Sequence, residues 1–93
     1  MSREIYLNER FRTIVRECPK PVRVEIGRAI DRLQTALGQP HQHAGVSIRK
    51  LHKNYFEIRV GLDLRLLFRV ESNSITFTFA GTHDAVRRFL KQL

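Results

Sequence analysis

The sequence has a single cysteine, Cys18, and no apolar run that approaches the about 18 residues of a transmembrane helix. One cysteine cannot form a disulfide within the chain, which excludes the disulfide-rich scaffolds of small extracellular proteins. The N-terminal residues do not have the pattern of a secretory signal peptide, so we expect a cytoplasmic protein that does not associate with membranes. Internal repeats, low-complexity segments and Gly/Ser linkers are also missing, and 93 residues predict one domain, residues 1–93.

Several motifs of catalysis and cofactor binding are absent as well. The chain has no Ser-x-Gly nucleophile turn, no glycine-rich phosphate loop and no Gly-x-Gly-x-x-Gly. His41 and His43 do not indicate a metal site, because no cysteine accompanies them and no nearby carboxylate completes a ligand set. Cys18 falls in the apolar stripe of a predicted helix, which favours a buried, inert thiol. We therefore expect neither a metal nor a cofactor.

Acidic residues are few relative to basic ones. Nine Asp and Glu oppose 17 Lys and Arg, which makes the net charge +8, while 42% of the residues are hydrophobic and suffice for a core. A charge of this size on a short chain favours a polyanionic partner, most often nucleic acid. The alternative is that the charge serves solubility alone.

The first 38 residues predict a short strand followed by a helical hairpin. Residues 3–7 form the strand, with Ile5 and Leu7 on one face, and Asn8 is the expected N-cap of the first helix. Proline fits a first helical turn but not a helix interior, so Pro19 and Pro21 end that helix and begin another. The apolar stripes have helical spacing and comprise Phe11, Ile14, Val15 and Cys18, then Val22, Ile26, Ala29, Ile30, Leu33 and Leu37.

After a polar loop at 39–47, the hydrophobic period changes to two. Alternation predicts strands at 55–60, 64–70 and 75–79, residues 47–52 are a further short strand candidate, and the short turns favour an antiparallel meander. The last strand is expected to place Ile75, Phe77 and Phe79 together on the apolar face that the helices cover. Residues 83–93 predict a short helix with four inward residues, Val86, Phe89, Leu90 and Leu93. The expected fold is α+β: a short N-terminal strand, a helical hairpin packed on an antiparallel β-meander, and a short C-terminal helix.

The opposite face of this sheet is predicted to be polar and mostly cationic. Its residues are Tyr55, Glu57, Arg59, Arg65, Arg69, Thr76 and Thr78, with Arg49, Lys50, His52 and Lys53 at its edge and His83 at its rim. We expect Arg59, Arg65 and Arg69 to be exposed on the side away from the helices. Such a basic face indicates nucleic-acid binding, and the alternative is an ordinary solvated sheet surface.

Three segments in this order resemble the RelE/ParE superfamily of bacterial toxins. Residues 50–61 read Lys-Leu-His-Lys-Asn-Tyr-Phe-Glu-Ile-Arg-Val-Gly, residues 64–70 read Leu-Arg-Leu-Leu-Phe-Arg-Val, and residues 75–84 read Ile-Thr-Phe-Thr-Phe-Ala-Gly-Thr-His-Asp. Members typically have Lys-Leu, Arg-x-Arg-Val-Gly, Tyr-Arg-Val-x-Tyr and a closing Gly-His or Gly-Thr-His. The resemblance covers residues 48–90. Many members carry a C-terminal tyrosine, whereas residues 85–89 here contain none.

The resemblance implies a ribosome-dependent mRNA endonuclease that a cognate antitoxin, expected to be acidic, holds inactive. In that scheme Arg65 steadies the scissile phosphate of ribosome-bound mRNA, Arg59 assists it, and His83 acts as acid or base. Lys50 matches the Lys-Leu element, and Lys53, Arg49 and Arg69 are the further candidate RNA contacts. Two alternatives remain: a ParE-like toxin that binds DNA gyrase without catalysis, and a plain basic RNA-binding domain.

The chemistry of RNA cleavage suits the same types of residue. RNA carries its own nucleophile, the 2′-OH, so the protein needs only to align it, move protons and neutralise the phosphorane. Arginine suits the phosphate because its planar fork meets two oxygens and keeps its charge. Glu57 is a candidate base, with a salt bridge to an arginine as its alternative. For His83 proton transfer competes with a purely structural place beside the helix N-cap.

Overall fold

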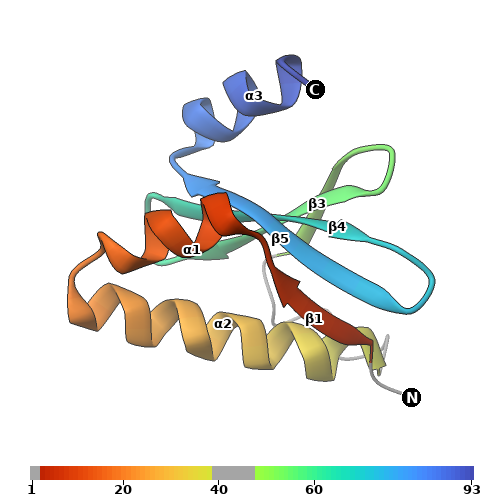
Figure 1. The fold of residues 1–93 in the computed structure, drawn as a ribbon, viewed down its shortest axis with the longest axis horizontal. Coiled ribbons are helices and arrows are strands. Elements are labelled where there is room, and N and C mark those ends of the chain that lie inside the picture. Colours follow the sequence, from red (N-terminus) through yellow and green to blue (C-terminus); the bar gives the residue numbers. More distant parts are fainter. Residues whose placement is uncertain (1–2, 39–47) are drawn as a thin grey trace.

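The computed structural model describes residues 3–38 and 48–93, and these form an α+β fold (Figure 1). In chain order the elements are β1 (Glu4–Leu7), α1 (Glu9–Arg16), α2 (Lys20–Gly38), β2 (Ile48–His52), β3 (Tyr55–Val60), β4 (Leu64–Val70), β5 (Ser74–Gly81) and α3 (His83–Lys91). The strands form one sheet in the order β1-β5-β4-β3-β2. The antiparallel meander of β2 to β5 is confirmed. In addition, β1 pairs with β5 in parallel, which the strand pattern did not predict.

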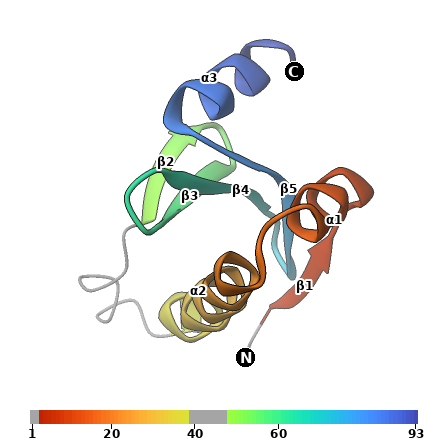
Figure 2. The same ribbon diagram turned by 90° about the vertical axis from the view of Figure 1, so that its left-hand side faces the viewer.

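The helical hairpin begins as its sequence predicts. The side chain of Asn8 accepts a hydrogen bond of 2.9 Å from the backbone N–H of Phe11, which confirms Asn8 as the N-cap of α1. Pro21 lies in the first turn of α2, where its missing N–H costs no helical hydrogen bond. The two helices cover one face of the sheet (Figure 2). The buried core between them comprises Phe11, Ile26, Ala29 and Leu33 of the helices and Ile58, Val60, Leu66, Phe68, Ile75, Phe77 and Ala80 of the sheet.

A β-bulge in β5 reverses the side-chain alternation in the middle of that strand. Phe77 pairs with Phe68, but Phe79 pairs with Leu67, so Thr78 is the extra residue. Every residue beyond the bulge changes face, and Phe79 lies on the side opposite Phe77. The prediction that Phe77 and Phe79 share the hairpin-covered face is therefore wrong. Thr78 is 5% exposed rather than part of an open polar face, and its Oγ1 has no hydrogen-bond partner among the described residues.

The third helix packs on the face opposite the hairpin (Figure 2). The ring of Phe79 stacks on that of Phe89 in α3, with centroids 4.6 Å apart and planes 14° apart. Leu67 and Val86 are fully buried and lie outside the hairpin core. The sheet therefore carries helices on both faces, and the expected open polar face is partly covered. Because α3 ends at Lys91, Leu93 is 66% exposed, which corrects its predicted inward position.

No helix within residues 3–38 and 48–93 combines the length and the apolar character needed to cross a membrane.

Candidate functional site

A buried carboxylate lies at the centre of the charged face. Glu57 of β3 is 6% exposed, and its Oε2 lies 3.5 Å from Nε of Arg65 and 3.6 Å from Nη2 of Arg49. Strand register brings these groups together, because Arg49 pairs directly with Glu57 across β2 and β3 while Leu67 flanks Glu57 on β4. The geometry is that of an acid held between two arginines, which matches the salt-bridge alternative for Glu57.

Arg65 is not the exposed arginine that the alternation predicts. Its side chain is only 17% exposed, because β4 is an inner strand flanked by β3 and β5 and α3 packs on this face. Arg59 and Gly81 are its partners in register, and Arg59 is exposed. The Nε and Nη1 donors of Arg65 form no hydrogen bond with any described residue. Both of these nitrogens are buried and Nε faces Glu57, so a phosphate ligand would meet the part of the Arg65 side chain that stays exposed.

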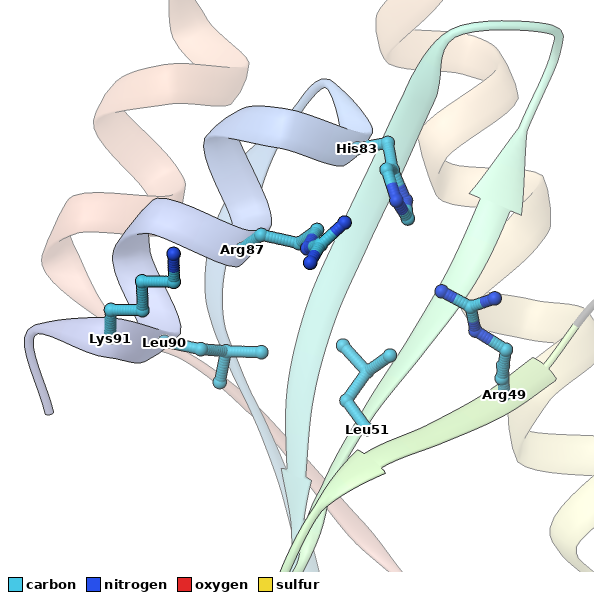
Figure 3. A pocket seen from close by; sticks show the side chains of 6 residues that line it. All are labelled: Arg49, Leu51, His83, Arg87, Leu90 and Lys91. Atoms are coloured by element: carbon cyan, nitrogen blue, oxygen red, sulfur yellow. The ribbon is translucent and has the colours of Figure 1, made fainter.

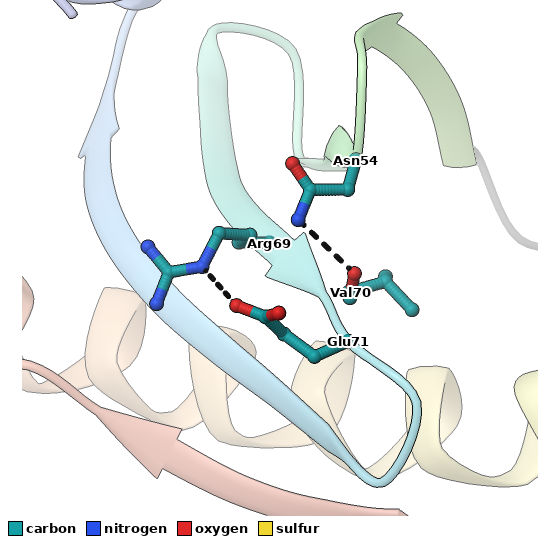
Figure 4. Close-up of polar contacts among 4 residues, drawn as sticks. All are labelled: Asn54, Arg69, Val70 and Glu71. Atoms are coloured by element: carbon teal, nitrogen blue, oxygen red, sulfur yellow. Dashed lines mark hydrogen bonds and ion pairs between the residues drawn. The ribbon is translucent and has the colours of Figure 1, made fainter.

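Arg69 lies on the same face as Arg65 but contacts other residues. It is half-buried, pairs with Tyr55 and Thr76 in register, and donates a 2.7 Å hydrogen bond from Nε to Glu71 (Figure 4). Hydrogen bonds to Tyr55 and Glu71 raise the pKa of Arg69 above its usual value. Four residues of strand, about 13 Å, separate it from Arg65. All three predicted arginines thus share one face, but only Arg59 is fully exposed.

The two predicted lysines lie away from the buried acid. Lys50 pairs with Phe56, a residue packed against the hairpin core, so its register places Lys50 on the opposite face from Arg49. Lys53 is exposed in the turn between β2 and β3, where its φ of 51° is in the left-handed region. Lys50 follows Arg49 directly and Lys53 lies four residues after it, but the pleat and the turn separate their side chains from that of Arg49.

A groove of about 390 Å³ runs between β2 and α3 (Figure 3). Arg49 reaches into it from β2, and His83 and Arg87 reach toward Arg49 from α3, with Leu51, Leu90 and Lys91 completing the lining. None of the described residues that line this groove is acidic. The structure therefore brings together two predicted site residues, Arg49 and His83, that are 34 positions apart in the sequence.

His83 owes its position to the start of α3. Thr82 is the N-cap, and its Oγ1 accepts a 3.2 Å hydrogen bond from the backbone N–H of Ala85. The capping role thus belongs to Thr82, and the half-buried imidazole of His83 faces the groove. Arg87 and Lys91 were missed as site residues. The sequence spacing could have identified them, because positions 83, 87 and 91 are four residues apart and share one helical face.

Chains of this shape occur among solved toxin structures. One is in the archaeal RelE–RelB complex from Pyrococcus horikoshii OT3, with 16% identity, 88% of this chain and 96% of that chain covered, and a TM-score of 0.71. Another is in the RelB–RelE antitoxin–toxin complex from Methanococcus jannaschii, with 19% identity and a TM-score of 0.67. This alignment covers 90% of this chain and 96% of that one. The chain has a RelE-like fold. YafQ from Escherichia coli BL21(DE3) is similar too, with 21% identity, 90% and 97% covered, and a TM-score of 0.63.

No protein-family model and no curated protein sequence matches the chain. The likeness is therefore one of three-dimensional structure. Within this RelE-like fold, the groove, the buried Glu57 and Arg65 all lie on the sheet face that carries α3.

The structure also bears on the candidate metal ligands and the thiol. Among residues 3–38 and 48–93, no three His, Cys, Asp or Glu side chains cluster as a metal site would require. His41 and His43 lie outside the described residues. Cys18 is partly buried against the hairpin core, and its thiol donates a 3.4 Å hydrogen bond to the carbonyl oxygen of Ile14. This packing accords with an inert structural thiol.

Proposed function

We propose that this chain is the toxin of a type II toxin–antitoxin system, a single domain of residues 1–93 that acts in the cytoplasm. Its activity is ribosome-dependent cleavage of mRNA, which inhibits translation. The observation that carries the proposal is the basic groove that joins Arg49 to His83 beside the buried Arg65, on a RelE-like fold. A cationic groove with a proton-transfer group at one end is what RNA cleavage requires.

The reaction uses the 2′-OH of RNA as nucleophile. The 2′-oxygen attacks the neighbouring phosphorus and loses its proton to a base, and the bond to the 5′-oxygen breaks as that oxygen gains a proton. The products are a 2′,3′-cyclic phosphate and a 5′-hydroxyl, and no metal takes part. Arg65 holds the phosphate with the exposed part of its side chain, and the exposed Arg59 across the strand pair assists it. His83 transfers a proton from the end of the groove.

Glu57 supports this chemistry by holding the arginines. Its carboxylate is within 3.6 Å of both Arg49 and Arg65, so ion pairs with these two side chains occupy it. We therefore assign Glu57 the positioning of these two side chains in preference to proton abstraction. Arg49 contacts RNA in the groove, and Arg69, Lys50 and Lys53 are outer contacts that attract the strand through their charge.

The partner is an acidic antitoxin. Structures similar to this chain are described as RelE–RelB and YoeB–YefM complexes, and the net charge of +8 favours an acidic binder. A second, apolar groove of about 330 Å³ between α1 and α2 fits its docking segment. Phe11, Val15, Ile26 and Ile30 line it together with the arginines Arg12, Arg16 and Arg23. An amphipathic segment with acidic flanks suits this combination.

The test is cleavage of mRNA on ribosomes by the wild type and by Arg65→Ala, Arg65→Lys and His83→Ala. Loss of phosphate stabilisation costs about 3 kcal/mol, so Arg65→Ala should be slower by about a hundredfold or more. His83→Ala should lose less, because water replaces part of a proton-transfer role. Thermal melting of each variant shows whether it is folded, and Arg65→Lys keeps the buried charge if Arg65→Ala unfolds.

Metal dependence and product ends complete the test. The toxin is incubated with EDTA before addition to ribosomes that keep their own magnesium, and cleavage should persist with a cyclic phosphate identified by mass spectrometry. Loss of cleavage that zinc or manganese restores would overturn the mechanism. A wild type that cleaves nothing, but inhibits DNA supercoiling by gyrase, would establish the ParE-like alternative. A wild type that binds RNA but neither cleaves it nor inhibits gyrase would support the alternative of a plain RNA-binding domain.

A further inference from the structure

One face of α3 presents a row of basic side chains along the groove. His83, Arg87 and Lys91 are successive at intervals of four residues, and all three line the same groove opposite Arg49 (Figure 3). One helical turn, about 6 Å along the axis, separates each from the next. Arg88 is also exposed on the same helix but does not line the groove, so the row is a property of one helical face.

The groove carries more positive charge than the acid beside it can balance. Arg49, Arg87 and Lys91 converge on it, and none of the described lining residues is acidic. Glu57, the buried carboxylate beside Arg49, already faces two arginines, Arg49 and Arg65. Converging like charges repel one another, and a bound polyanion removes that repulsion. The arrangement is thus set up for an anionic ligand that extends along α3.

The apolar floor of the groove favours a single nucleic-acid strand over a duplex. Leu51 of β2 and Leu90 of α3 point toward each other between the two walls of cations (Figure 3). Exposed apolar side chains contact unstacked bases and ribose, which a single strand offers and a duplex keeps inside its stack. The spacing of the cations is close to the separation of successive phosphates on an extended strand.

We propose that α3 is a guide for the RNA strand, on which Arg87 and Lys91 bind the two phosphates that follow the scissile one. The single strand leaves His83 along the helix, and Leu51 and Leu90 contact its bases. This inference rests on the proposed function and adds to it: a binding subsite of two nucleotides beyond the cleavage point. Arg87 and Lys91 are binding residues there, and they take no part in proton transfer.

The experiment measures binding of a short single-stranded RNA whose 2′-oxygens are methylated, so that it cannot be cleaved. Fluorescence anisotropy gives the dissociation constant over a range of salt concentrations. Each phosphate contact contributes about 0.7 to the slope of log affinity against log salt for a single strand. We expect Arg87→Gln and Lys91→Gln each to reduce the slope by about 0.7, and the double variant to reduce it by about 1.4.

Arg88→Gln is the matched control, since it removes the same charge from the same helix outside the groove. It should leave the slope unchanged, and a paired RNA duplex should show no difference between Arg87→Gln and Arg88→Gln. Equal slopes for Arg87→Gln and Arg88→Gln on the single strand would overturn the inference, as would a wild type that binds no single-stranded RNA. Circular dichroism checks that the helix content, and with it α3, is retained in each glutamine variant.

Cleavage on ribosomes separates this inference from the proposed function. A wild type that cleaves mRNA while the Arg87 and Arg88 variants bind alike refutes the strand guide and leaves the nuclease standing. A wild type that does not cleave, but shows the predicted difference in slope, supports the RNA subsite and refutes the nuclease.

Discussion

The change Glu57→Gln tests whether a buried acid organises the charged face. Glutamine keeps the shape of the side chain and removes its charge. Arg65 then remains 17% exposed, with two donors that have no hydrogen-bond partner among the described residues and no carboxylate beside it. Arg49 loses the same partner, but its side chain is 60% exposed and is readily hydrated. The cost of the substitution therefore comes from Arg65.

The magnitude follows from the burial of the two groups. Breaking one side of a fully buried pair costs about 3–5 kcal/mol, because a charge is left without compensation. Because Arg65 retains some contact with solvent, we expect a loss of about 2–3 kcal/mol. For a chain of this length the melting temperature should fall by about 15 °C. Urea unfolding should show a lower midpoint with an unchanged m-value.

The control is Glu71→Gln at the other end of the face. Glu71 is only 2.7 Å from Nε of Arg69, a shorter distance than any in the Glu57 cluster, but both side chains of this pair are substantially exposed at 49% and 35%. Exposed pairs contribute less than about 1 kcal/mol, so the closer pair should matter less. A loss in Glu57→Gln no greater than in Glu71→Gln would refute the reasoning.

A double-mutant cycle isolates the pair itself. Arg65→Met alone leaves Glu57 buried beside only the exposed Arg49, and it should also destabilise the chain. The double variant removes both charges, so its loss should be smaller than the sum of the two single losses, with a coupling of about 2 kcal/mol. Additive losses would mean that the two groups do not interact.

Two further predictions concern α3 and the N-terminal strand. Phe89→Ala removes one ring of the stack that holds α3 to the sheet, and it should lower the free energy of unfolding by about 2 kcal/mol, as measured by thermal melting. Leu93→Ala, at a position that is 66% exposed, should lower it by less than about 0.5 kcal/mol. Similar losses in the two variants would contradict the packing of α3. A hydrogen bond to Glu4, and then the charge of Glu4, raise the pKa of the exposed Tyr6 above its usual value of about 10. Because this pKa is raised in the folded state, its contribution to stability is fully present below the pKa of the unfolded tyrosine and is lost as pH rises through the pKa of the folded one. Glu4→Gln should therefore lower the pH midpoint at which Tyr6 ionises, measured by tyrosinate absorbance in a variant that lacks Tyr55.

Local patterns determined the elements of this chain. The Asn8 cap, Pro19 between the helices, Pro21 in the first turn of α2 and the alternation in 55–60 and 64–70 each act over a few residues, and the structure has the corresponding elements. The cationic composition and the toxin resemblance likewise came from the sequence, and the RelE-like fold is confirmed. Arg49 and His83 were candidate site residues on the same grounds, and the structure places both in one groove.

The arrangement of these elements was decided by contacts between residues far apart in the chain. The bulge at Thr78 exists only where β5 meets β4, and no period in β5 alone reveals that Phe79 changes face. That reversal gives α3 an aromatic surface on the side opposite the hairpin, which covers part of the charged face and closes the groove around His83 and Arg87. The burial of Glu57 and Arg65 follows from the same packing. Sequence periodicity specifies which side chains share a strand face, but burial depends on what packs against that face, and this is a property of the whole fold.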